Sequence, residues 1–102
     1  MSYLDAVKGL KFKVQKVEIE GITFYLRELS GRARMEFDAE PNIELRVLKM
    51  AHASLCDENG NLTEDPKQFN DFIAAVPNKI LNALLKEFSQ LNLTREDELK
   101  NS

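Results

Sequence analysis

The chain has 102 residues, a net charge of −3 and a hydrophobic fraction of 43%. This length favours a single domain spanning residues 1–102, and the composition is typical of a folded protein. The acidic balance argues against nucleic acid as a partner, because phosphate binding needs a basic surface. No apolar run approaches the roughly 20 residues of a membrane-spanning helix, so we expect no membrane partner.

The first third of the sequence predicts an N-terminal arm followed by a β-hairpin. Residues 1–9 are typical of an arm or a short helical turn. Residues 11–28 are rich in β-branched and aromatic side chains on both sides of Glu20-Gly21, which is a turn signal. Two strands alone are marginally stable, so we expect this hairpin to pack against helices or further strands.

The rest of the chain predicts a predominantly α-helical part of three to four helices. Ser30, Asn42 and Asp65 are suitable N-caps, and apolar residues recur with helical spacing after them. We expect helices at about 31–39, 43–56, 66–75 and 77–91, followed by a short C-terminal tail. The residues expected mainly in the core of the last helix are Leu81, Leu84, Leu85 and Phe88. Strands followed by helices favour an α+β fold.

The polar segment between the second and third predicted helices resembles the start of a calcium loop. Asp57, Asn59 and Asn61 have the required spacing, but Gly60 is at the fourth place rather than the sixth. The twelfth place is Gln68, which lacks the carboxylate of a calcium ligand. We therefore expect a small hairpin with a tight turn here, and no bound ion.

His52 and Cys56 are the only histidine and the only cysteine, so no internal disulfide can form. Their spacing of four residues would place both on one helix face. A metal site would need further matched ligands, and a cysteine nucleophile would need an orienting third group. We expect a structural or surface histidine. We predict no catalytic residue, no metal and no cofactor, and hence no enzyme activity.

Aromatic side chains are more numerous than one contact between a hairpin and a helix requires. Most are expected in the core, but some are expected on a partner-binding surface formed by the hairpin edge and the helix at 66–76. The candidate partner-binding residues are Phe24, Tyr25, Phe69, Phe72 and Ile73.

Charge is unevenly distributed along the chain. Residues 1–34 hold seven basic and four acidic side chains, a net charge of +3, and the remainder carries −6. Such a division would permit copies to associate head to tail as a homo-oligomer, or would steer a charged partner. The simpler interpretation is that the solvated faces are uneven.

Four short motifs accompany these elements in a fixed order. They are Leu29-Ser30-Gly31, Leu55-Cys56-Asp57-Glu58-Asn59-Gly60-Asn61, Leu91-Asn92-Leu93-Thr94 and Lys100-Asn101-Ser102. Taken with the hairpin and helices, this order resembles the small tail assembly chaperones of long-tailed, siphovirus-type bacteriophages and prophages. The resemblance covers nearly the whole chain.

The resemblance implies a role in tail morphogenesis. Such chaperones bind the tape measure protein, keep it soluble and help to recruit tail tube subunits. The resemblance also implies that the protein is located in the cytoplasm of the bacterial host and is absent from the mature virion. It implies no catalytic residues. The alternatives are a structural tail-completion or connector protein of a phage or prophage, and a small protein-binding regulator.

Overall fold

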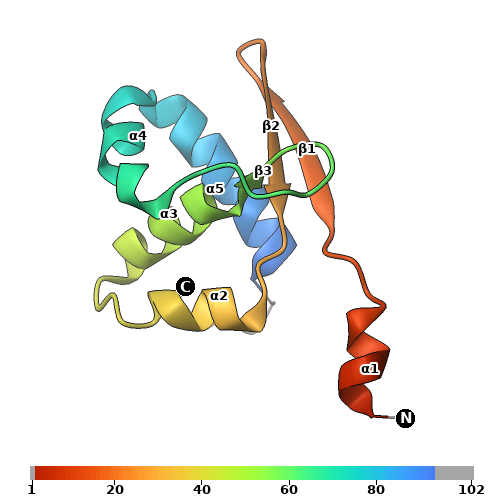
Figure 1. Cartoon of the computed structure of the whole chain (residues 1–102). Helices are drawn as coiled ribbons and strands as arrows, with labels where there is room; N and C mark the ends of the chain where they lie inside the picture. Colours follow the sequence, from red (N-terminus) through yellow and green to blue (C-terminus); the bar gives the residue numbers. More distant parts are fainter. Residues whose placement is uncertain (1, 94–102) are drawn as a thin grey trace.

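The computed structural model describes residues 2–93, and the predicted C-terminal tail lies outside them (Figure 1). The elements in chain order are α1 (Tyr3–Lys8), β1 (Val14–Ile19), β2 (Ile22–Arg27), α2 (Gly31–Phe37), α3 (Ile43–Ser54), β3 (Leu55–Cys56), the 3₁₀ turn η1 (Pro66–Gln68), α4 (Phe69–Ala75) and α5 (Asn78–Asn92). An antiparallel hairpin precedes several helices, which confirms the predicted α+β class.

The hairpin formed by β1 and β2 has one unbroken antiparallel register. Its two-residue turn is Glu20-Gly21, as the sequence predicts, with φ angles of 52° and 78°. Two positive φ angles in succession define a type I′ turn, whose twist matches that of the flanking strands. The turn therefore fixes the register of the hairpin.

A third strand follows α3 where the sequence predicts the last turn of a helix. α3 ends at Ser54, because the backbone of Leu55 is extended and Leu55–Cys56 form β3. β3 pairs antiparallel with β2, so the strand order is β1-β2-β3. Cys56 also forms a bridge with Leu62, in agreement with the small hairpin expected around Asn59-Gly60.

Side-chain caps begin the helices at the predicted residues. The side chains of Ser30 and Asn42 accept hydrogen bonds from backbone N–H groups three residues later. Asp65 caps η1 by accepting a hydrogen bond from the N–H of Lys67, two residues later, and η1 adds one 3₁₀ turn before α4 in the predicted 66–75 helix. Each bond satisfies a backbone donor that the first turn of a helix leaves unpaired.

The core lies between one face of the sheet and the helices α3 and α5. Its most buried apolar members are Val17, Leu26, Met50, Ala51, Leu55, Ile80, Leu84 and Phe88. Of the residues predicted to be core in the last helix, Leu84 and Phe88 are fully buried, and Leu81 and Leu85 are half-buried. The packing therefore joins the hairpin near the start of the chain to the helix near its end.

α1 stands apart from the rest of the fold, as the red helix of Figure 1 shows. Ser2 caps it by accepting a hydrogen bond from the N–H of Asp5. None of its six residues is buried. An isolated helix of this length is marginal in water, and packing against the rest of residues 2–93 buries none of its side chains.

Candidate interaction surface

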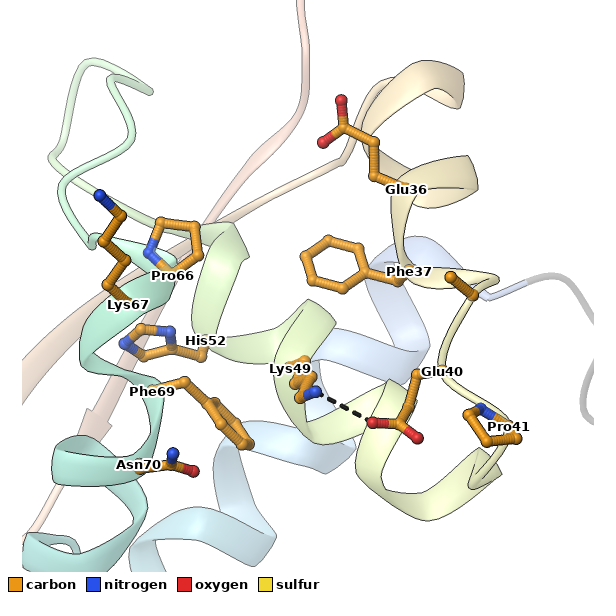
Figure 2. Close-up of a pocket in the computed structure, with 11 residues that line it drawn as sticks. Glu36, Phe37, Glu40, Pro41, Lys49, His52, Pro66, Lys67, Phe69 and Asn70 are labelled. Atoms are coloured by element: carbon orange, nitrogen blue, oxygen red, sulfur yellow. Dashed lines mark hydrogen bonds and ion pairs between the residues drawn. The ribbon is translucent and has the colours of Figure 1, made fainter.

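A groove of about 550 Å³ lies between α2, α3 and the η1–α4 segment (Figure 2). Its lining combines apolar rings with charged side chains of both signs. The apolar members are Phe37, Ala39, Pro41, Pro66 and Phe69, and the polar members are Glu36, Glu40, Lys49, His52, Lys67 and Asn70.

One wall of the groove is the connection between α2 and α3, which Glu40 fastens to α3. The Glu40 carboxylate accepts a hydrogen bond from Lys49 Nζ at 2.9 Å. Its backbone carbonyl accepts two from the Arg46 guanidinium, at 3.0 and 2.7 Å. The bond from Lys49 lowers the pKa of Glu40, so the carboxylate stays ionised to a lower pH than a free glutamate. These bonds hold the wall in one position.

The opposite wall rests on His52, whose side chain is only 2% exposed. The imidazole lies between the rings of Phe69 and Phe72, with centroid distances of 5.7 and 4.9 Å. Its Nε2 has no hydrogen-bond partner among the described residues, and the Glu64 carboxylate lies 4.0 Å away. Burial lowers the pKa of His52, so the neutral ring is favoured.

The structure divides the five predicted partner-binding residues between different places. Phe24, Tyr25 and Phe72 are half-buried and border a second hollow, of about 200 Å³, beside β3. Phe69 lines the larger groove but is only 5% exposed, because it packs on His52 and under the Lys49 side chain. Ile73 is half-buried and borders neither hollow.

The outer edge of β1 is open, in line with the expectation that the hairpin edge is available. Within residues 2–93, no strand pairs with this edge. On β1 an ion pair joins Lys16 and Glu18 at 3.2 Å, and the hydrogen bond that Lys16 donates to the Glu18 carboxylate raises the pKa of Lys16. Charged side chains on an edge strand discourage indiscriminate pairing with other chains.

The fold is similar to that of a solved structure, the tail assembly chaperone of bacteriophage HK97. The TM-score is 0.58 at 20% sequence identity, over 87% of this chain and 96% of the HK97 chain. The fold is that of a phage tail assembly chaperone. No protein-family model matches the chain, and no curated protein matches it in sequence. The likeness to the chaperone therefore lies in the arrangement of the elements.

Some features of this chaperone fold bear on what it can bind. No group of three or more metal-ligating side chains occurs in the part of the chain that the structure describes. Over the same residues, no helix has the length and apolar character needed to cross a membrane. The surface offers reversible contacts instead: a groove, a smaller aromatic hollow and an open strand edge.

Sequence reasoning did not identify the two carboxylates that line the groove, Glu36 and Glu40. Residues 36–44 contain four acidic side chains and no basic one, namely Glu36, Asp38, Glu40 and Glu44. Only Glu40 forms an ion pair within residues 2–93. This run of acids is visible in the sequence, but only the fold shows that two of its members, Glu36 and Glu40, line a hollow with apolar rings.

Proposed function

We propose that this protein is a tail assembly chaperone of a long-tailed bacteriophage or prophage. It binds the tape measure protein, keeps it soluble and helps to recruit tail tube subunits. The observation that supports the proposal is the shared fold with the HK97 tail assembly chaperone, over 96% of that chain. The short motifs of the sequence support the same role independently.

The surface suits a client that must be covered and later released. A long helical protein with apolar stretches needs its exposed side chains shielded from water until it assembles. Half-buried aromatic residues beside β3 offer apolar contact, and the wider groove adds charged groups that orient a partner. Both hollows are open to solvent, so a client can bind there through reversible, non-covalent contacts. We place this binding in the host cytoplasm, before the virion is complete.

Co-expression with the tape measure protein of the same genome tests the proposal. We expect the tape measure protein to become soluble and to co-purify with this chain. Tyr25→Asp and Phe72→Asp should each weaken the complex, because both residues border the aromatic hollow. Gln90→Asp, at an exposed position on α5, is the matched control. Unchanged solubility of the client, with no complex recovered, would refute the proposal.

Mass spectrometry of purified virions separates the chaperone from a structural tail protein. A chaperone leaves the particle, so its peptides should be missing while those of the tape measure protein are abundant. A tail-completion or connector protein would be present at a fixed number of copies per virion. A small regulator would be missing too, but it would not change the solubility of the tape measure protein.

A further inference from the structure

Residues 65–76, called the strap below, lie against α3 without a hydrogen bond to it. The strap comprises η1, α4 and one flanking residue at each end (Figure 1). Within residues 2–93, its hydrogen bonds all stay inside the segment, and no ion pair joins it to another element. The strap therefore keeps its own hydrogen bonds wherever it lies.

The strap is attached to α3 through the contacts of a few rings. The rings of Phe69 and Phe72 lie against the His52 imidazole on α3, and Lys49 Nζ lies 6.0 Å from the centroid of Phe69. Of residues 65–76, only Phe69 is buried. A segment with so little buried apolar surface belongs to the least stable parts of a fold, which open without global unfolding.

His52 is a poor attachment point for the strap, because its buried Nε2 has no hydrogen-bond partner among the described residues. The nearest carboxylate, that of Glu64, lies 4.0 Å away. A buried polar atom without a hydrogen bond costs free energy. Water would supply the missing bond if the strap moved away, so opening removes this cost.

A hollow lies on each side of the strap. The groove of about 550 Å³ is lined on this side by Pro66, Lys67, Phe69 and Asn70, and Figure 2 shows these residues along one wall. The aromatic hollow of about 200 Å³ is bordered by Phe72. The strap thus separates two spaces that would become one cleft, with His52 at its base, if the strap lifted.

The chain is fixed just before and just after the strap. The N–H of Thr63 donates a hydrogen bond to the carbonyl of Leu55 on β3, at 3.2 Å. At the other end, Val76 and Pro77 are extended, and the Pro77 carbonyl accepts the first hydrogen bonds of α5. The flanking elements therefore do not need the strap in order to keep their own bonds.

We propose that the strap opens as one unit, turning about Glu64 and Val76, while the sheet, α3 and α5 stay folded. Opening uncovers His52 and joins the groove and the aromatic hollow into one cleft. A partner that fits only this wider cleft would shift the equilibrium toward the open form. The inference goes beyond the proposed function and does not depend on it.

Acylation of His52 by diethyl pyrocarbonate measures the opening, because the reagent attacks neutral imidazole and the sequence has one histidine. The His52 side chain is only 2% exposed, so the closed form should not react. We expect complete modification of the folded protein at pH 7.5, at a rate that is nearly constant up to about 1 M urea. Modification through global unfolding would accelerate steeply with urea, because that route exposes far more surface.

Two matched ring deletions separate opening of the strap from access through the groove. Phe69→Ala removes the one buried side chain of α4 and should raise the rate of His52 modification by about tenfold or more. Phe37→Ala removes a half-buried ring from the opposite wall of the groove and should change the rate by less than about twofold. Equal acceleration in both variants would place the path through the groove and overturn the proposal.

Hydrogen exchange of the wild type, followed by mass spectrometry, gives a readout that needs no substitution. The amides of α4 should exchange together, with protection at least about 100-fold below that of α5. The proposal is wrong if α4 and α5 lose protection only together, with the same dependence on urea. It is also wrong if His52 reacts only under conditions that unfold the whole chain.

Discussion

Asn92 accepts a hydrogen bond from the backbone N–H of Leu29 through its side-chain oxygen, at 2.7 Å. Its amide nitrogen donates to the backbone carbonyl of Arg27, at 3.3 Å. The Asn92 side chain, at the end of α5, thereby pairs with the Arg27 carbonyl and the Leu29 N–H in the segment that connects β2 to α2. Asn92 belongs to one of the motifs that carry the family resemblance, and these bonds give that residue a structural role.

Replacing Asn92 by alanine should destabilise the fold by about 1–3 kcal/mol, because it leaves a half-buried donor and acceptor without partners. Urea unfolding followed by circular dichroism measures the change. Asn82→Ala, an exposed asparagine on the same helix, is the control and should change stability by less than about 0.5 kcal/mol. Equal effects of the two substitutions would contradict the role of Asn92.

Replacing Glu20 by asparagine should stabilise the protein by up to about 1 kcal/mol. Glu20 is the only non-glycine residue among the described ones with a positive φ, at 52°, and asparagine adopts this conformation with less strain. Thermal unfolding measures the gain. The substitution also removes an exposed ion pair with Lys79, which contributes little. Lys79→Ala removes that pair alone and should leave the melting temperature nearly unchanged.

Lowering the pH from 7.5 to 5.5 should destabilise the wild type through His52. Burial lowers the pKa of His52 in the folded protein, whereas the unfolded chain has an ordinary value near 6.5. Below that value the unfolded state binds the proton more readily, so stability is lost as the pH falls toward the folded pKa, by at most about 1.4 kcal/mol per pH unit.

The variant His52→Leu isolates this effect, because the sequence has no other histidine. Its urea midpoint should change less between pH 7.5 and 5.5 than that of the wild type. The lowered pKa values of Glu40 and Asp57 act at more acidic pH and do not contribute in this window. A variant as sensitive to pH as the wild type would show that another group is responsible.

Two glycine substitutions should have opposite effects. Gly60 has a φ of +85°, and an added Cβ would lie 3.2 Å from a methyl group of Val14, so Gly60→Ala should cost about 1–2 kcal/mol. Gly31, the first residue of α2, has open space around it, so Gly31→Ala should be neutral or stabilising by up to about 1 kcal/mol. Chemical unfolding of both variants measures the difference. Similar losses would count against the argument from backbone conformation.

The sequence predicts the locally determined parts of this fold well. The caps Ser30, Asn42 and Asp65 and the turn Glu20-Gly21 act through hydrogen bonds and dihedral angles within a few residues. The apolar repeat of α5 likewise places Phe88 in the core. Such features can be recognised without knowledge of the rest of the chain.

The parts that the sequence does not predict depend on contacts between distant segments. Leu55 becomes a strand residue because β2 supplies a partner for its backbone, although the helical periodicity continues through it. Phe69 was predicted to lie on a partner-binding surface, but His52 and Lys49 cover its ring. The sequence near Phe69 does not show that these two residues of α3 pack on it. The groove follows from the placement of α2 against α3 and α4, which no local pattern encodes.

The packing of α5 against the hairpin has a consequence for how the protein is made. The inner faces of β1 and β2 are covered by a helix that the ribosome synthesises about fifty residues later. Two strands alone are marginally stable, so the nascent hairpin exposes Val17 and Leu26 until α5 has emerged from the exit tunnel. A message or frame change that stops translation before Asn92 would therefore release an aggregation-prone fragment rather than a smaller folded protein.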